Sequence, residues 1–358
     1  MKKIILFTDS LGAGGAQRQL VGLAIMLKNS AYNVTVATYF NIDFYKKHLD
    51  DAGVRNILIP NADDCKKRIL AVRSFFKKEK PDWVIAYQET PSLVACMAKA
   101  TGCNFRLIVS ERNTTQRIGM NERVRFLLYR FANAIVPNSY AQQEFLSTHY
   151  SWMNCKLKTI TNFVDLEHFN YVERQKHKVP EIVVAASIWA SKNTLGFIEA
   201  IKIVVEKGYN LHVSWYGKTE NNIDYYNECY KKIQEYNLQT FIDLKEKTKQ
   251  IKQVYKGADF FCLPSFYEGT PNVICEGIST GLPVICSNVC DNHIYVQSGI
   301  NGLLFDPNNS EDMAAKISEA LDLSEHDYLK YSYNSRSIAE NKLSKDKFVN
   351  SYIEIIES

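Results

Sequence analysis

Short runs of apolar residues alternate with amphipathic segments along nearly the whole chain. In the first half, apolar runs that predict strands lie at residues 4–8, 34–39, 54–59, 83–87, 106–109, 134–137 and 158–161. The segments between them space their apolar residues for helices, for example at 17–28, 65–78 and 123–132. Strands that are apolar on both faces are typical of parallel sheets covered by helices. The pattern therefore predicts an α/β fold.

The alternation lapses between residues 162 and 180 and then restarts. Strands are expected at 181–187, 211–216, 241–244, 259–263 and 283–287, and helices near 194–207, 225–236, 251–256, 271–280 and 311–321. A chain of 358 residues is too long for one ordinary core, so we expect two domains, each of Rossmann-like size. The residues from 162 to 180 would link them.

The expected domains are 1–168 and 169–342, and a C-terminal helix at about 343–358 is expected to pack back on the first domain. Ligands of open parallel sheets lie beyond the carboxyl ends of the strands. Two such domains facing each other would enclose a central cleft.

Residues 266–284 place two carboxylates around the start of a helix. Glu268 and Glu276 are eight positions apart, with a Gly-Thr-Pro-Asn turn between them. Pro271 suits the first helical turn, where its missing N–H costs nothing, and Gly281 suits the C-terminal stop. The unpaired N–H groups of the first turn form an anion site. A carboxylate on either side favours a phosphate joined to hydroxyl-bearing rings, as in a sugar nucleotide; solvated acids are the alternative.

A glycine-rich turn follows the first strand and opens a helix. Gly12, Gly14 and Gly15 would let the backbone approach a phosphate closely. Gln17 stands where the dinucleotide-binding fingerprint has its third glycine, and no acidic residue ends the second strand. Phosphate binding and a tight strand-to-helix turn both remain open.

Charged side chains follow strands in both halves. Lys192, after the first strand of the second half, can balance a diphosphate as a point cation, or can be a solvated lysine before a helix. Glu111 and Arg112 end a first-half strand, where functional side chains are expected. They can also simply pair with each other.

The helix around residues 123–131 mixes cations with apolar residues. Val124, Leu127, Leu128 and Phe131 share one helical face, which predicts that this face packs in the core. The remaining cations, with a second set at Lys66, Lys67, Arg68, Lys77 and Lys78, can either contact anionic lipid or be solvated.

Composition narrows the classes of function only slightly. The net charge of +4 permits anionic ligands or a membrane surface and gives no case for nucleic acid. The nine cysteines include no C-x-x-C pair and lie mostly in apolar runs, which indicates buried, reduced thiols in a cytosolic protein. The first apolar run stops too early for a signal peptide, and no run has transmembrane length. No acidic metal motif stands out, since Asp63 and Asp64 lie in an expected loop.

Several of these motifs together resemble family 4 of the retaining glycosyltransferases, which have the GT-B fold. The resemblance covers nearly the whole chain and is densest from about 180 to 325. It is carried by the Glu268–Glu276 element, residues 255–265, 281–284 and 299–302, the crossing at 161–165, Lys192, and the glycine loop at 14–18.

The resemblance implies a role for each matched residue. Glu276 would bind the nucleotide ribose, Glu268 the donor sugar and Lys192 the diphosphate. The donor-binding set it implies is Gly14, Gly15, Ser187, Lys192, Glu268, Gly269, Thr270, Pro271, Asn272 and Glu276. The candidates for catalysis are Glu268, Lys192, Glu111 and Arg112.

In the implied reaction, the acceptor hydroxyl attacks the anomeric carbon on the leaving-group face, and a donor phosphate oxygen takes its proton. The configuration is retained. The lysine and the helix start stabilise the charge of the departing diphosphate. No metal and no cofactor are expected, because the nucleotide sugar is a co-substrate.

The chain departs from the family pattern at three places. Ser187 stands where the family often has an arginine, five residues before the lysine. Glu111 and Arg112 fall where a histidine is common. Residues 290–293 replace paired glycines, which bears on recognition of the sugar.

The function implied is that of a glycosyltransferase of EC class 2.4, which moves a sugar from a UDP- or GDP-sugar to a glycan acceptor. Lipid-linked glycans of bacterial surface polysaccharide, such as capsule or O-antigen, are the expected acceptors. The expected location is the cytoplasm, at the inner face of the plasma membrane. The alternatives are a GT-B epimerase or phosphorylase, or a catalytically silent partner subunit that binds sugar nucleotides.

Overall fold

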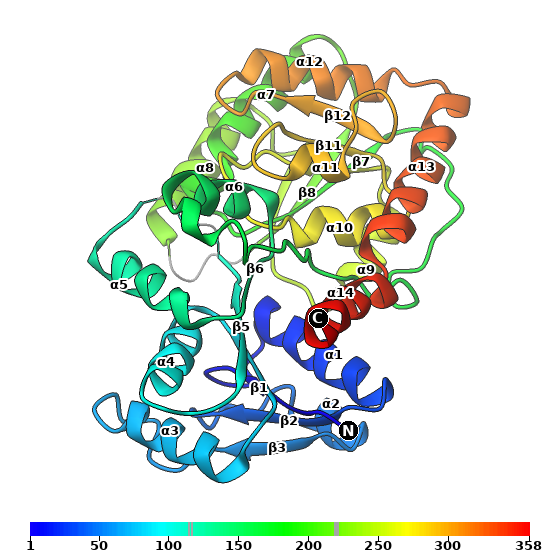
Figure 1. The fold of residues 1–358 in the computed structure, drawn as a ribbon. Coiled ribbons are helices and arrows are strands. Elements are labelled where there is room, and N and C mark those ends of the chain that lie inside the picture. Colours follow the sequence, from blue (N-terminus) through cyan, green and yellow to red (C-terminus); the bar gives the residue numbers. More distant parts are fainter. Residues whose placement is uncertain (114, 116, 218–221) are drawn as a thin grey trace. The chain divides into compact units, whose positions relative to one another are not determined.

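A computed structural model of the protein describes residues 1–113, 115, 117–217 and 222–358. The chain divides into two compact units. Unit 1 is Met1–Phe163 with Lys345–Ser358, and unit 2 is Val164–Ser344. Each unit contains a six-stranded parallel sheet with helices on both faces (Figure 1). The α/β fold class is thereby confirmed.

Unit 1 has the strand order β3-β2-β1-β4-β5-β6. Its strands are β1 (Lys3–Phe7), β2 (Asn33–Thr38), β3 (Arg55–Leu58), β4 (Trp83–Tyr87), β5 (Arg106–Glu111) and β6 (Ala134–Pro137). Its helices are α1 (Gly15–Asn29), α2 (Lys46–Asp51), α3 (Arg68–Glu79), α4 (Glu89–Ala100), α5 (Met120–Leu128), α6 (Tyr140–His149) and α14 (Lys345–Glu357). Helices α1, α2 and α14 cover one face, and α3 to α6 cover the other.

Helix α14 completes the core of unit 1 although it lies far along the chain from the rest of that unit. It packs beside α1, where the Phe348 ring lies 5.0 Å from that of Phe163 (Figure 1). The hydroxyl groups of Tyr352 and Tyr87 share a buried hydrogen bond of 2.9 Å. The apolar side chains of α14 therefore belong to the core of this sheet.

Unit 2 has the strand order β12-β11-β10-β7-β8-β9. Its strands are β7 (Glu181–Ala185), β8 (His212–Gly217), β9 (Ile242–Glu246), β10 (Phe260–Leu263), β11 (Val284–Ser287) and β12 (Gly302–Phe305). Its helices are α7 (Thr194–Glu206), α8 (Ile223–Glu235), α9 (Ile251–Gly257), α10 (Asn272–Ser279), α11 (Asn292–Tyr295), α12 (Ser310–Leu321) and α13 (Glu325–Leu343). Counted from the start of each unit, the two strand orders are the same.

Four elements differ from the expectation, and the first is the short helix α11, which was not expected. Residues 158–161 do not form a strand, although Lys158 and Ile160 hydrogen-bond along the edge strand β6. Strand β12 was not expected; it starts at Gly302, where any side chain would collide with the carbonyl of Val284. Helix α13 was also missed, because most of its residues are polar.

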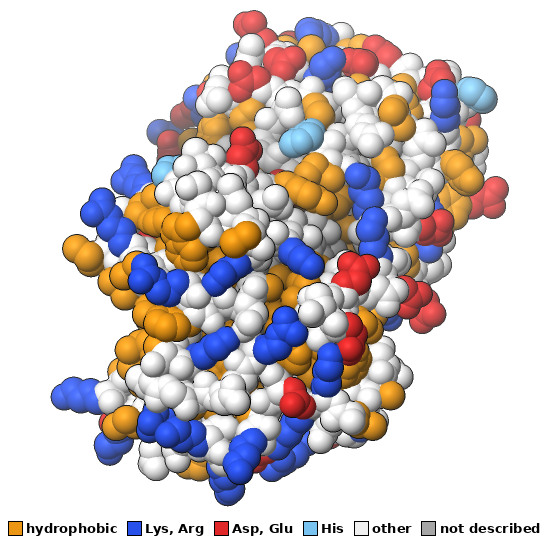
Figure 2. Space-filling model, viewed as in Figure 1, with side chains coloured by type: hydrophobic (Ala, Val, Ile, Leu, Met, Phe, Trp, Pro, Cys, Tyr) orange, Lys and Arg blue, Asp and Glu red, His pale blue; other side chains and the backbone are white. Residues whose placement is uncertain are grey.

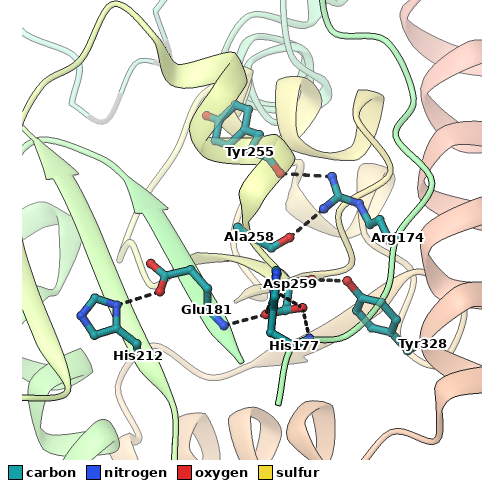
Figure 3. A network of polar contacts seen from close by, with 8 residues as sticks. All are labelled: Arg174, His177, Glu181, His212, Tyr255, Ala258, Asp259 and Tyr328. Atoms are coloured by element: carbon teal, nitrogen blue, oxygen red, sulfur yellow. Dashed lines mark hydrogen bonds and ion pairs between the residues drawn. The ribbon is translucent and has the colours of Figure 1, made fainter. Parts of the chain in front are cut away.

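The segment expected as a linker is hydrogen-bonded to residues at the amino-terminal end of strand β10 in the unit 2 sheet. Arg174 donates to the carbonyl of Ala258 at 2.7 Å, and Asp259 accepts from the backbone N–H groups of His177 and Glu181 at 2.9 and 2.7 Å (Figure 3). The side chains of Arg174 and Asp259 are buried, and burial lowers the pKa of Arg174. The carboxyl-terminal ends of the strands lie on the opposite side of the sheet and take no part in these contacts.

None of the helices in the described parts of the chain has both the length and the apolar character needed to span a membrane.

Candidate functional site

The strand order of the unit 2 sheet predicts where along the sheet a ligand would bind. Strands β7 and β10 are neighbours at the centre, and the chain leaves them toward opposite sides of the sheet. Open parallel sheets bind ligands beyond the carboxyl ends of two such strands. Lys192 comes shortly after β7, and Glu268 comes shortly after β10. The fold therefore brings these two predicted residues to the same point.

Lys192 and Glu268 form an ion pair there. Nζ of Lys192 lies 2.6 Å from Oε1 of Glu268, and the two side chains are 26% and 11% exposed. The hydroxyl of Ser265 donates to the same oxygen at 2.6 Å. A backbone hydrogen bond of 3.0 Å from Phe266 to Ser191 joins the two loops. The carboxylate is thus held in one orientation by a cation and a hydroxyl.

The turn after Lys192 is also fixed. Asn193 adopts the left-handed conformation (φ 55°, ψ 40°), which asparagine tolerates better than most residues. Its side-chain amide donates to the carbonyl of Pro307 at 2.8 Å. Ser187 lies earlier in the same loop and is partly exposed. The loop that carries Lys192 is therefore anchored to the segment that follows β12.

Helix α10 begins beside Glu268. Pro271 is the N-cap and lies one position earlier than its expected place in the first turn. Glu276 is 7% exposed. It lies four residues after Asn272, so both side chains share one face of α10, and helical side chains lean toward the N-terminus. Glu276 therefore leans back toward the start of the helix, and the anion site expected there stays a prediction.

In unit 1 the predicted glycine loop opens α1. Gly14 is the N-cap, and a side chain there would collide with the amide of Gln17. Asp9 accepts hydrogen bonds from Gln17 at 3.1 Å and from the backbone N–H of Ser10 at 2.6 Å. Gly15 is the first residue of α1. A role for Gly14 and Gly15 toward a donor stays a prediction.

Glu111 and Arg112 do not pair with each other. Glu111 is fully buried and bonded by the hydroxyl of Tyr129, by the amide of Gln142 at 3.3 Å and by Arg125 at 3.4 Å. Burial raises the pKa of Glu111, and the Arg125 charge opposes this effect. The alternative of a Glu111–Arg112 pair is wrong, and Glu111 instead ties α5 and α6 to the end of β5.

Arg112 is buried among different partners. Its guanidinium hydrogen-bonds the side chains of Asn162 and Ser110 and lies over the Tyr87 ring, 4.9 Å from the centroid. These contacts hold the segment before unit 2 against the carboxyl ends of β4 and β5. A catalytic role for Glu111 or Arg112 stays a prediction.

Gln88 was not singled out from the sequence. It follows β4, which is the unit 1 neighbour of β1, and accepts a hydrogen bond from Thr8 at 3.1 Å. Its backbone has φ 76° and ψ 171°, a region that is essentially restricted to glycine. No sequence pattern reveals such a torsion angle. Strained residues of this kind gather at functional sites, and this one lies at the switch point of unit 1.

The expectation of a core face on α5 is wrong for three of its four residues. Val124, Leu127 and Phe131 are exposed, and Leu128 is partly buried against the core, whereas Phe126 and Tyr129 are fully buried. Burial of a residue such as Phe126 contributes about 2 kcal/mol. The ion pair of Arg125 with the buried Glu111 fixes which side of α5 points inward. That pair joins distant parts of the chain, so periodicity could not reveal it.

The cysteines and the potential metal ligands form no site of their own. All nine cysteines are free; Cys65 and Cys155 are exposed, Cys290 is partly buried and the remaining six are buried. Within the described ranges, no group of three or more His, Cys, Asp or Glu side chains is placed to hold a metal ion.

Solved structures share the fold over nearly the full length. A glycosyltransferase from Rickettsia africae ESF-5 matches with a TM-score of 0.87 and 18% identity, covering 99% of this chain and 98% of that one. HepE of Anabaena, in complex with UDP, matches with a TM-score of 0.85 and 18% identity, covering 99% of both chains. The expected GT-B fold class is confirmed.

Two curated relatives are similar in sequence. The UDP-Gal:α-D-GlcNAc-diphosphoundecaprenol α-1,3-galactosyltransferase of Escherichia coli is 31% identical over 43% of this chain and 42% of that protein. The GalNAc-α-(1→4)-GalNAc-α-(1→3)-diNAcBac-PP-undecaprenol α-1,4-N-acetyl-D-galactosaminyltransferase of Campylobacter jejuni is 22% identical over 78% of this chain and 77% of that protein.

Two family models match adjoining parts of the chain. Residues 13–168 match the model described as Glycosyltransferase Family 4, and residues 168–337 match Glycosyl transferases group 1. The resemblance carried by the sequence motifs is thereby confirmed. Between them the models match residues 13–337, and the chain belongs to the family 4, group 1 glycosyltransferases, which are transferases of EC class 2.4.

Proposed function

We propose that this glycosyltransferase moves a sugar from a UDP- or GDP-sugar to a lipid-linked glycan, with retention of anomeric configuration. The observation that carries the proposal is the Lys192–Glu268 ion pair beside the start of α10, at the switch point of unit 2. The presence of UDP in the HepE structure supports a nucleotide donor. The diphosphoundecaprenol and PP-undecaprenol acceptors named for the two relatives support an acceptor on a lipid diphosphate.

The ion pair suits a site that must hold both a sugar and a diphosphate. Oε1 of Glu268 accepts from Lys192 and Ser265, and among the described residues Oε2 has no hydrogen-bond partner. That oxygen would accept from a hydroxyl of the donor sugar. An ammonium group has three N–H donors, so Lys192 can keep its bond to Glu268 and still bind phosphate oxygens.

The remaining donor contacts follow along α10. Glu276 would accept from the ribose hydroxyls, and the backbone N–H groups of Gly269 and Thr270 would donate to sugar or phosphate oxygens. Pro271 has no N–H, and that of Asn272 donates to the carbonyl of Thr270 at 2.8 Å. Ser187 lies in the loop before Lys192 and would face the same donor. A carboxylate that accepts from a hydroxyl makes a charge-assisted hydrogen bond, about twice as strong as a neutral one.

Transfer would proceed by front-face attack. The bond between the anomeric carbon and the phosphate oxygen breaks as the acceptor oxygen bonds to the same carbon from the same side. The acceptor's proton goes to an oxygen of the departing diphosphate. Lys192 and the positive end of α10 stabilise the charge that develops on the diphosphate. In this proposal the transfer needs neither a metal ion nor a cofactor.

The setting proposed is the synthesis of a bacterial surface polysaccharide, at the cytoplasmic face of the plasma membrane. The relatives' lipid diphosphate acceptors support this setting. Nucleotide sugars and the diphosphate end of such an acceptor would meet there.

The test is a transfer assay with purified protein. UDP- and GDP-sugars are offered with and without undecaprenyl-diphosphate-linked glycans, with EDTA throughout, and release of nucleoside diphosphate is followed. NMR of the product gives its anomeric configuration. Acceptor-dependent release and an α-product from an α-donor are expected. An inverted product contradicts retention, and loss of release in EDTA contradicts metal independence.

Other outcomes would replace the proposal. Conversion of the donor to its epimer without acceptor indicates an epimerase. Donor binding without turnover against every acceptor indicates a silent binding subunit.

A further inference from the structure

Helix α5 carries an exposed apolar stripe. Met120, Val124 and Leu127 are 72%, 45% and 52% exposed, and Phe131 in the following turn is 37% exposed. Spacings of four, three and four residues place these side chains along one side of a helix. The opposite side holds the buried Phe126 and is fixed in the core. The stripe is therefore a surface and does not belong to the core.

Unpaired cations accompany the stripe. Arg123 and Arg130 are exposed and lie on one flank of it, and the exposed Arg117 precedes the helix. Among the described residues, none of these three arginines forms an ion pair. The one acidic residue of α5, Glu122, is occupied at the start of the helix, where it accepts from the N–H of Gly119 at 2.9 Å. Figure 2 shows hydrophobic side chains over α5 with Lys and Arg side chains beside them.

Unit 1 as a whole carries a positive net charge, as do the arginines beside the stripe of α5. Unit 1 contains 25 Lys and Arg against 15 Asp and Glu, a net charge of +10. Unit 2 contains 18 against 24, a net charge of −6, and the two values sum to the chain's +4. The small total conceals a strongly basic unit joined to an acidic one. Unit 1 alone would be attracted to a negatively charged surface.

The apolar stripe and its flanking arginines together indicate which kind of partner binds α5. An apolar stripe flanked by arginines is the pattern of helices that lie in the plane of a bilayer interface. The apolar side chains reach the acyl boundary there, while long cationic side chains extend to the phosphates. A second copy of this chain would bring the same arginines against each other. Charge complementarity therefore favours anionic lipid over self-association.

We propose that α5 docks unit 1 on an anionic bilayer, with Met120, Val124 and Leu127 at the acyl boundary and Arg123 and Arg130 at the headgroup phosphates. This inference deepens the proposed function, since a lipid-linked acceptor lies in a bilayer. It is measured by binding alone and does not depend on turnover.

The experiment is co-sedimentation of the full chain with vesicles. The vesicles are pure phosphatidylcholine, or phosphatidylcholine with phosphatidylglycerol. Wild-type protein is expected to bind only the anionic vesicles and to be released by salt. The double variant Val124→Ser/Leu127→Ser should bind at least roughly tenfold more weakly, since it removes apolar area from the interface. Arg123→Gln/Arg130→Gln should remove the preference for phosphatidylglycerol.

Two controls isolate the stripe. Leu70→Ser removes an apolar side chain of α3 that is 68% exposed, and should leave vesicle binding unchanged. Lys231→Gln removes a cation of unit 2 whose side chain is 77% exposed, and should also leave it unchanged. All variants should unfold at the wild-type temperature, because none of the changed side chains is buried.

Three results would overturn the inference. The first is wild-type protein that does not bind anionic vesicles. The second is a stripe variant that binds like wild type. The third is a dimer in sedimentation velocity that the stripe variant abolishes, which would make the stripe a subunit interface. Transfer to a short-chain, water-soluble acceptor should be equal in wild type and stripe variants. Loss of transfer in all of them would instead count against the proposed function.

Discussion

In unit 2 the switch point between β7 and β10 holds a lysine–carboxylate pair, whereas in unit 1 the switch point between β1 and β4 holds the neutral side chains of Thr8 and Gln88 beside a carboxylate, Asp9, that accepts from the neutral donors Thr8, Ser10 and Gln17. The strand order around the two points is the same. Among the ion pairs of unit 1, the pair of Glu111 with Arg125 is buried under α5 and α6 and serves packing. Topology supplies the place for a site, and the chemistry depends on which side chains stand there.

The largest effect is expected from Lys192→Ala. In the proposed site it removes the cation that would face the departing diphosphate, so the transfer rate should fall by roughly 10²–10³-fold. Lys202→Ala, which removes a helix-surface lysine paired with Glu206, is the control and should transfer at the wild-type rate. An unchanged rate in Lys192→Ala would mean that the switch point of unit 2 is not where transfer occurs.

Glu111→Ala should instead affect stability. It removes the buried one of the two carboxylates that pair with Arg125, and because Glu89 stays 3.1 Å from Arg125 the loss should be smaller than the roughly 3–5 kcal/mol of a fully broken buried pair. Urea unfolding measures this loss, and Glu144→Ala, at an exposed position on α6, should change little. A Glu111→Ala variant that is stable but has lost transfer activity would show that Glu111 serves the reaction and not the packing of unit 1.

The dependence of the free energy of unfolding on pH provides a second test of Glu111. Burial raises the pKa of Glu111 above its ordinary value of 4.5, so the folded state holds its proton at a higher pH than the unfolded chain. The contribution of Glu111 to the free energy of unfolding is therefore full below pH 4.5 and declines as the pH rises through the raised pKa. Replacement by alanine should remove this decline, and a persistent decline would assign it to another group.

Glu276→Gln should weaken donor binding with a smaller effect than the loss of Lys192. In the proposed site it replaces one charge-assisted hydrogen bond to the ribose with a neutral one, which would cost about 1–2 kcal/mol, or roughly tenfold in Kd. Calorimetric titration with UDP and with GDP measures the change, and Glu311→Gln, at an exposed position on α12, is the control. Equal affinity in both variants would remove Glu276 from the nucleotide site.

The smallest effect is expected from Gln88→Gly. Glycine adopts the torsion angles of Gln88 without strain, and the relief should outweigh the entropy that glycine loses on folding, for a gain of about 1 kcal/mol in the free energy of unfolding. Thr101→Gly, at a position with ordinary torsion angles, should destabilise. Urea unfolding separates the two, and a destabilised Gln88→Gly variant would show that the side-chain contacts matter more than the strain.

Much of the architecture was accessible from periodicity, because strands buried on both faces leave continuous apolar runs. The bounds expected for β4 and β6 agree with the structure. The Glu268–Glu276 element was recognisable because a proline, glycines and two carboxylates fall close together in sequence. Ser265, which orients Glu268, was not recognisable, since a serine after a strand carries no pattern of its own.

The remaining differences depend on contacts between distant residues. Both sides of α5 carry apolar side chains, and the pair of Arg125 with Glu111 decides which side is buried. At Gly302 the backbone of β11 lies too close for a side chain, so β12 can pair with β11 there only through a glycine. The torsion angles of Gln88 depend on its neighbours in the folded unit, including Thr8 and Ser110.

Helix α14 has a consequence for the order in which the protein can fold during synthesis. The ribosome completes unit 2 before it makes residues 345–357, yet Phe348, Tyr352 and Ile356 fill the core of unit 1. The apolar side chains of unit 1 that contact α14 therefore stay uncovered until more than half of the chain has been translated after them. Unit 2, made from one continuous stretch, can fold as it emerges. The unit that is translated first is thus the unit that is finished last.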